Sequence, residues 1–311
     1  MRAALEGKDL VINAALPRYN LAIMAAALEA DVDYLDLAGG GEDQLRLSPR
    51  WRNAGRTAVL GMGEDPGIGN VLARCAADAL DTVDSVKIRD GETSRSGEYE
   101  FVCLFSPETF IEETLADGIV YEDGVWRTVP PLSGYEEYPF PPPVGRVPVY
   151  VVSHEEVETI PRFLGKPVRS CDFKLALLPE TVAMLRRIER EGLMKGEKRA
   201  KFLATIPPPA DLAGKITGFA TILVEVKGTR DGRRETRVLH ATMDHVEASK
   251  AYGTTGTAYL TGTGAAVGSL LLLDGRTPRG GVFVPEQLNP GPVFDRLRGM
   301  GVDVRQAVRA A

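Results

Sequence analysis

The chain has 311 residues, a length at which one hydrophobic core usually gives way to two domains. Its formal net charge is −6 and its 37 Lys and Arg residues are scattered, so it has no basic field for a phosphate backbone, and we exclude nucleic acid as a partner. Three cysteines without C-x-x-C spacing fit neither a disulfide framework nor a structural zinc site.

Hydropathy points away from a membrane partner. The apolar run near the N-terminus, 21–28, is shorter than the roughly 20 residues that a membrane span needs. No basic segment with a cleavage site precedes it. We therefore expect a cytoplasmic protein.

The N-terminal part alternates between strand and helix patterns. Short apolar runs end at Pro17, at Gly39-Gly40-Gly41 and at Gly63, and stretches of strong helix formers follow the first and the last of them. The sequence predicts strands over 9–16, 34–38 and 57–62 and helices over 21–30 and 70–80. This alternation is typical of a parallel, wound sheet.

From about residue 84 the pattern becomes that of a mixed sheet. A hairpin signal stands at Glu122-Asp123-Gly124, and proline clusters at 139–143 and 207–209 mark loops. The strands that we predict here cover 85–89, 101–105, 147–152, 169–175, 219–227 and 237–243. The C-terminal part then has a Gly/Thr-rich stretch over 253–264, an apolar helix over 265–273 and a last helix over 291–298.

Two glycine patterns imitate the dinucleotide-binding fingerprint with one residue too many. They are Gly61-x-Gly63-x-x-x-Gly67 and Gly262-x-Gly264-x-x-x-Gly268. Neither is followed by an acidic residue at the expected distance, and Pro66 removes a backbone donor from the first turn. We expect both to be structural helix starts rather than phosphate loops.

Short motifs recur along most of the chain. They are KDLVINAALP at 8–17, DYLDL at 33–37, DPG at 65–67, FSPET at 105–109, VPPLSG at 129–134, HEE at 154–156 with TIP at 159–161, and GVFVPE at 281–286. Together they resemble the saccharopine dehydrogenase family, closest to its lysine 6-dehydrogenase-like branch. The resemblance implies an α/β fold with a partial Rossmann-type parallel sheet and a second, mixed-sheet α+β domain.

The same resemblance implies an enzyme that uses NAD or NADP. Hydride would pass between the nicotinamide and a carbon bearing an amine, through an imine, with a small amino acid substrate of the saccharopine or lysine type held between two domains of a homodimer. Family members begin with a strand and a phosphate-binding loop, whereas this chain opens only eight residues before a later strand. We therefore expect the phosphate-binding loop to be absent from this chain, which then binds cofactor weakly and does not turn over as written.

These patterns divide the chain into two domains. Residues 1–69, with a returning segment at about 254–311, are predicted to form the partial dinucleotide-binding domain. Residues 70–253 are predicted to form the substrate and dimerisation domain.

Ligands of an open α/β sheet bind at the carboxyl ends of its strands. This rule makes Asp65 a catalytic candidate that faces the substrate. The candidates for cofactor binding are Asn13, Leu16, Pro17, Asp36 and Gly67. For Pro17 and Gly67, turn geometry is an equally good interpretation.

His154 and Glu155 follow a predicted strand and are the other catalytic candidates. The ordinary pKa of histidine lies near neutrality, so His154 could relay a proton from a substrate amine. The alternative is that Ser153 caps a helix and Glu156 completes a capping box. Thr159, Arg169 and Lys174 are candidates for substrate binding, the last two as partners of a carboxylate or else as exposed strand residues. His240 and His245 lack further ligands, and we predict no metal site.

Two other functions stay open. The first is a shortened, non-catalytic homologue that serves as a binding or dimerisation module, which cofactor titration would reveal. The second is a polyamine-forming reductase of the carboxynorspermidine or homospermidine type, which a panel of amine substrates would reveal.

Overall fold

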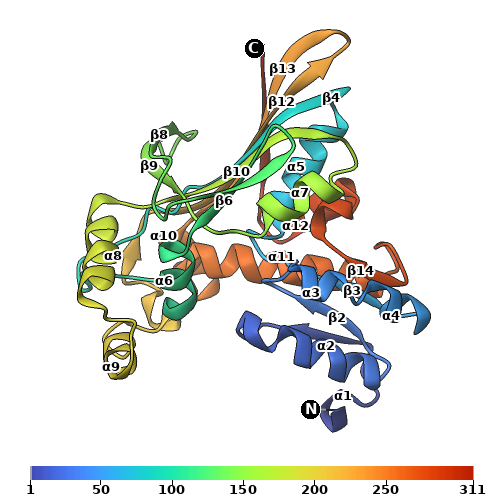
Figure 1. The fold of residues 1–311 in the computed structure, drawn as a ribbon, viewed down its shortest axis with the longest axis horizontal. Coiled ribbons are helices and arrows are strands. Elements are labelled where there is room, and N and C mark those ends of the chain that lie inside the picture. The colour runs from blue at the N-terminus through green and yellow to red at the C-terminus, as the bar shows by residue number, and fades with distance from the viewer. Residues whose placement is uncertain (1, 311) are drawn as a thin grey trace.

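The computed structural model describes residues 2–310 as two main sheets joined through a long central helix, with a separate two-stranded sheet (Figure 1). The smaller sheet is parallel throughout, in the order β1 (Leu10–Asn13), β2 (Asp33–Asp36), β3 (Thr57–Val59) and β14 (Gly281–Phe283). Its helices are α1 (Arg2–Leu5), α2 (Asn20–Glu29), α3 (Glu42–Leu45) and α4 (Ser48–Asn53). The predicted Rossmann-type sheet is confirmed.

The larger sheet is mixed, as the sequence predicts. Its order is β15 (Val304–Ala310), β13 (Arg233–Asp244), β12 (Phe219–Arg230), β4 (Thr82–Asp90), β10 (Val168–Ala176), β6 (Gly118–Glu122) and β7 (Val125–Val129). β9 (Arg146–Val151) pairs with β10 and with β8 (Glu136–Pro139), and β5 (Arg95–Ser96) pairs with β11 (Ile216–Thr217). Only the pairing of β4 with β10 is parallel among the described strands of this sheet.

Helices cover the larger sheet and fill the space between the two sheets. Those around it are α5 (Ile68–Asp78), α6 (Pro107–Leu115), α7 (Glu156–Phe163), α8 (Pro179–Glu191), α9 (Glu197–Leu203), α10 (His245–Tyr252), α11 (Gly256–Leu273) and α12 (Pro290–Gly299), with short 3₁₀ turns at Pro17–Tyr19, Pro209–Leu212 and Pro285–Gln287. α5 packs on β12 and β13, and α11 contacts strands of both sheets.

The helix α11 is long and apolar enough to cross a membrane by length and composition alone. In the fold it contacts β1 and β2 on one side and β12 and β13 on the other. Just over half of its most apolar window, 56%, is buried inside the molecule. It therefore serves as a core helix between the sheets.

Glycines of both patterns allow close packing between α11 and the loop after β3, or within that loop. A Cβ added at Gly264, in the middle of α11, would lie 2.2 Å from the carbonyl oxygen of Gly63, and one at Gly268 would lie 2.4 Å from Cγ of Met62. Gly67 has a φ of +138° and approaches Gly63 so closely that only glycine fits. The first pattern starts a helix as expected, whereas the second lies inside one.

Three expectations about single segments were wrong. Residues 101–105 form a loop and not a strand, because Phe101 packs against Phe110 and Ser106 then caps α6. The Gly/Thr-rich stretch is largely helical, since the Thr255 side chain accepts a hydrogen bond from the Ala258 N–H and starts α11. The returning segment divides, because β14 joins the parallel sheet while β15 extends the larger one.

The role of these glycines gives a stability prediction. Gly264→Ala should lower the free energy of unfolding by about 1–3 kcal/mol, the usual cost of overpacking a core. Gly262→Ala is the matched control in the same helix, because a Cβ there meets nothing within 4 Å. It should be neutral or stabilise by up to about 1 kcal/mol. Urea unfolding measures both, and equal effects of the two changes would contradict the packing role.

Candidate active site

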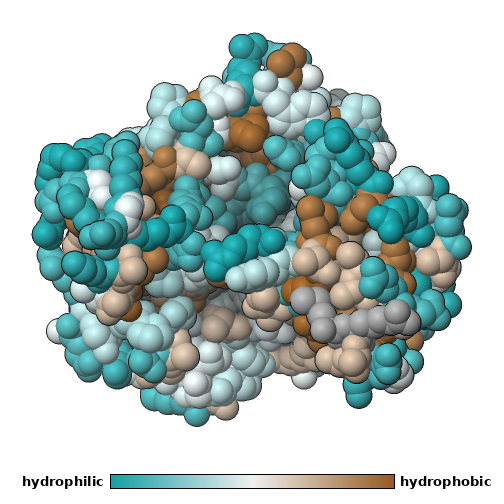
Figure 2. All heavy atoms as spheres, turned by 60° about the horizontal axis from the view of Figure 1, so that its bottom comes forward, coloured by the Kyte–Doolittle hydropathy of each residue, from teal (hydrophilic) through white to brown (hydrophobic). Residues whose placement is uncertain are grey.

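A cleft of about 670 Å³ opens at the carboxyl ends of β1 and β2. Its walls come from the loop after each of these strands, from the start of α6, from the first turns of α11 and from the loop that follows β9. Figure 2 shows the surface hollowed between two lobes, with apolar atoms gathered on the lobe at the right. The cleft therefore lies where the parallel sheet faces the larger sheet.

His154 enters this cleft from the loop between β9 and α7. Its ring stacks on Phe173, with 3.9 Å between centroids and 6° between planes, and its Nδ1 pairs with the buried carboxylate of Glu156. Burial disfavours the charged ring, but the carboxylates of Glu156, Glu155 and Glu113 outweigh burial and raise the pKa of His154 to about 10. At neutral pH His154 is therefore an imidazolium that can donate a proton.

The capping interpretation of this loop is wrong. α7 begins at Glu156, its N-cap is Glu155, and no side chain caps it. The Glu156 carboxylate is unavailable to a capping box because it holds His154.

Four carboxyl groups line the cleft around this ring. Burial is the main cause that raises the pKa of Asp65 well above its ordinary value, with Asp90 and Glu156 adding to it. Burial and then repulsion from Glu92 raise the pKa of Asp90 to about 7, and burial raises the pKa of Glu113 to about 7. Burial also raises the pKa of Glu155. Asp90 and Glu113 can therefore take up and release protons near neutrality.

The cofactor candidates separate into two groups. Leu16 and Pro17 line the cleft. Asn13 and Asp36 belong to a buried network under it, because Asn13 donates to Tyr34 at 2.9 Å and Asp36 accepts from Tyr34, from Gln44 and from the Gly61 N–H. Both carboxylate oxygens of Asp36 therefore already accept hydrogen bonds from other residues of the protein. Gly67, as described above, packs against Gly63.

The candidates for substrate binding lie outside the cleft. Lys174 donates to Glu136 at 2.8 Å and points to the opposite face of β10 from Phe173, because neighbouring strand residues alternate between faces. Arg169 is exposed at the far end of β10 and pairs with Asp123 at 2.8 Å. Thr159 is buried in α7, and its methyl group would contact a side chain added at Gly40.

Asp90 and Glu113 are the cleft carboxyls that our sequence analysis missed. Asp90 is the last residue of β4, at the carboxyl end of a strand that runs parallel to β10. The rule used for the first sheet would have found it if applied to the second. Glu113 lies one turn beyond Thr109 on α6, so the spacing i, i+4 from the FSPET motif was its only signal.

One set of side chains has the composition of a metal site. Ligand atoms of His154, Glu155 and Glu156 lie within 4.8 Å of one another. Since Nδ1 of His154 is engaged by Glu156, the set is held together by a proton between them, and a metal ion would have to displace it.

The residues at the mouth of the cleft fit the nicotinamide end of a dinucleotide. Leu16, Pro17, Leu37 and Ala38 give an apolar wall at the carboxyl ends of two parallel strands, next to His154. An apolar wall suits a planar ring, and the carboxyl ends of the strands are where open α/β sheets bind nucleotides.

Two family models match the chain. The saccharopine dehydrogenase C-terminal domain matches residues 63–302, and the saccharopine dehydrogenase NADP binding domain matches residues 1–59. These matches confirm the family to which the sequence motifs point.

Two curated relatives match nearly the whole chain. One is the carboxyaminopropylagmatine dehydrogenase of Synechocystis sp., 32% identical over 97% of this chain and 80% of the relative. The other is the carboxynorspermidine synthase of Vibrio cholerae, 31% identical over 96% of this chain and 78% of the relative.

Among solved structures, apo saccharopine dehydrogenase (L-Glu forming) from Saccharomyces cerevisiae is similar. Its TM-score is 0.71 at 14% identity, and the match covers 99% of this chain and 86% of that one. At this identity the match shows a shared fold.

The ion pair of His154 gives a prediction for its titration. Glu156→Gln removes a carboxylate that favours the imidazolium, so the pKa of His154 should fall from about 10 by about 1–3 pH units, the usual effect of one adjacent opposite charge. NMR of the three histidine rings across a pH series measures it. His240 on β13 is the internal control and should titrate unchanged. An unaltered His154 titration would show that Glu156 does not hold the proton.

Proposed function

The chain belongs to the saccharopine dehydrogenase family of NAD(P)-dependent oxidoreductases, and we propose that its substrate is a carboxylated polyamine. In this proposal an imine between an amine and a carbonyl compound gains a hydride at carbon and a proton at nitrogen, and becomes a secondary amine. The reverse reaction oxidises the amine.

The charged groups that line the cleft are the observation that favours a polyamine substrate. Asp65, Asp90, Glu113 and Glu155 line it, and none of the described residues that line it is a lysine or an arginine. A substrate with several carboxylates, such as saccharopine, would need cationic partners there, whereas a chain of ammonium groups complements the carboxyls. The names of the two curated relatives, each a carboxylated polyamine enzyme, support the same choice.

The apolar wall of Leu16, Pro17 and Leu37 would hold the nicotinamide, which would supply or accept the hydride. Proton transfer is then the task of the chain's own residues. Because Glu156 occupies Nδ1 of His154, its Nε2 is the ring atom left to protonate the imine nitrogen as it is reduced. Phe173 keeps the ring in one plane by stacking.

Asp65 and Asp90 have a second task in this proposal. An amine attacks a carbonyl only when it is neutral, so an arriving ammonium must lose a proton. Burial raises the pKa of both carboxyls, that of Asp90 to about 7, so Asp90 can accept that proton near neutral pH and return it, with Asp65 beside it. The amine would thus be held and deprotonated by the same pair.

A substrate panel tests this function. The full-length enzyme, with the phosphate-binding loop that our sequence analysis expects to be absent from this chain, is incubated with NAD⁺ or NADP⁺ and with carboxynorspermidine, carboxyaminopropylagmatine, saccharopine or lysine, and formation of the reduced nicotinamide is followed. One of the two carboxylated polyamines should have a kcat/KM at least about tenfold above those of saccharopine and lysine, which a single well-placed charge contact supplies. A preference for saccharopine or lysine would refute the polyamine assignment.

The role of His154 has its own test. His154→Ala should lower kcat by about 10²–10⁴, the usual contribution of a positioned acid or base. Because Phe173 loses its stacking partner, His154→Gln serves as the control that keeps a side chain in the space, and it should lose activity as well. A loss of less than threefold in both variants would remove His154 from the proton transfer.

A further inference from the structure

We propose that Glu92, at the inner end of the cleft, binds the terminal ammonium group of the polyamine and so selects its length. This inference rests on the proposed function, because it assigns one end of that substrate. It concerns residues that neither the sequence motifs nor the comparisons single out.

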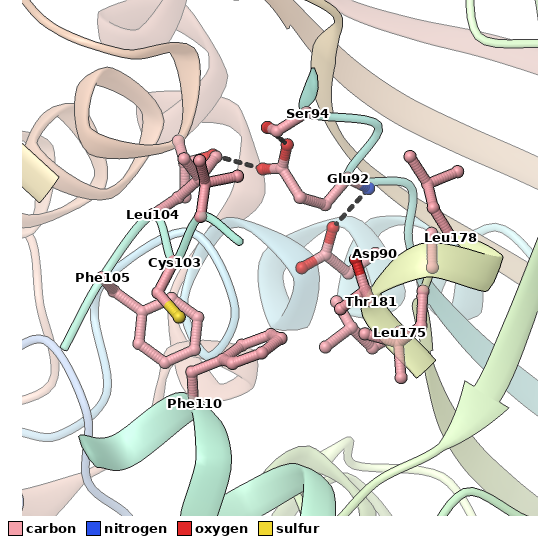
Figure 3. A pocket seen from close by; sticks show the side chains of 14 residues that line it. Asp90, Glu92, Ser94, Cys103, Leu104, Phe105, Phe110, Leu175, Leu178 and Thr181 are labelled. Carbon is pink, nitrogen blue, oxygen red and sulfur yellow. Dashed lines mark hydrogen bonds between the residues drawn. The ribbon is translucent and has the colours of Figure 1, made fainter. Parts of the chain in front are cut away.

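A small inner chamber of about 50 Å³ continues the cleft away from the parallel sheet. The two spaces share lining residues, among them Asp90, Leu175 and Thr257, so they lie directly side by side. Apolar side chains such as Leu104, Leu178 and Phe110 make most of the chamber wall, and Glu92 is the carboxylate beyond Asp90 (Figure 3). An extended amine with its reacting nitrogen near His154 would place its far end in this direction.

Glu92 is oriented by three side chains. The hydroxyl groups of Ser94 and Thr257 donate to its two carboxylate oxygens, and His245 lies with Nε2 at 2.9 Å from Oε1. Its own backbone N–H donates to Asp90 at 3.0 Å. The carboxylate is therefore fixed before any ligand arrives, which lowers the entropic cost of binding.

The hydrogen bonds of His245 show that it does not neutralise Glu92. The Gly256 N–H donates to Nδ1 of His245 at 3.0 Å, so Nδ1 carries a lone pair and the proton sits on Nε2. The ring is then neutral, and it is completely buried. All three side-chain partners of Glu92 are thus uncharged donors.

The charge of Glu92 therefore lacks a cation among the described residues. The only ion-pair geometry found for it involves the neutral His245, and its side chain is 18% exposed. A carboxylate accepts about four hydrogen bonds, so three donors leave Glu92, which lines the chamber, able to accept a further one. A poorly solvated negative charge with an open position favours a cationic ligand, here a primary ammonium.

Glu92 could instead only fix the segment after β4 to the start of α11, through Thr257. That structural role would not depend on the substrate. The two roles therefore differ in whether a change at Glu92 discriminates between substrates with and without the terminal ammonium.

The test compares two substrates in wild type and Glu92→Gln. One substrate is carboxynorspermidine, and the other is its analogue in which a methyl group replaces the terminal ammonium. For carboxynorspermidine, Glu92→Gln should raise KM by about 10–100-fold with kcat changed less than about threefold, as expected for loss of a binding contact. For the analogue, wild type and variant should agree within about twofold. Glu247→Gln, an exposed carboxylate on the same helix as His245, is the control and should change neither.

A second pair of variants covers the case in which Glu92→Gln does not fold. Thr257→Val removes one donor to Glu92 without changing its charge and should raise KM for carboxynorspermidine alone, while Thr257→Ser should restore it. Equal effects on both substrates would overturn the assignment of Glu92 and leave the polyamine function intact. If wild type turns over neither carboxynorspermidine nor carboxyaminopropylagmatine, the proposed function fails, and the assignment of Glu92 fails with it.

Discussion

The close approach of α11 to the loop after β3 holds the two halves of this protein together. Gly264 lies so near the Gly63 carbonyl that no side chain fits between them. Gly268 lies similarly close to the Met62 side chain. The helix thereby contacts both sheets at once, and its first turns reach the cleft between them. The distance between the sheets, and with it the width of the site, follows from this backbone contact.

The second constraint is electrostatic. Several carboxyl groups are buried around one imidazolium, and the free energy cost of burying charge would be large if all of them were ionised. The raised pKa values lower this free energy cost, because Asp90 and Glu113 titrate near neutrality and not in the acid range. The same arrangement that lowers this cost makes the groups able to exchange protons. A cationic substrate would lower this cost further by adding positive charge to that of His154.

The order of the elements was largely predictable, since the parallel strands β1 to β3 are short apolar runs followed within a few residues by Pro or Gly. The loop at 101–105 was not, because its apolar side chains pack without strand partners. Asp65, His154 and Glu155, which we predicted from their positions after strands, line the cleft. We expected Lys174 to bind substrate, but it points to the opposite face of β10 from Phe173. The sequence shows that neighbouring strand residues alternate between faces, but it does not show which face lines the cleft. Glu92 and His245 meet only in three dimensions, 153 residues apart.

The pairing of β3 with β14 has a consequence for synthesis of the chain. Thr57 aligns with Gly281, so the parallel sheet is completed by a strand from near the C-terminus. As the chain leaves the ribosome, the N-terminal lobe must wait for almost all of the polypeptide before its last strand arrives, with the edge of β3 unpaired meanwhile. Such long-range pairing slows folding, and it makes completion of the parallel sheet a late event that follows translation of the cleft carboxyls and of His154.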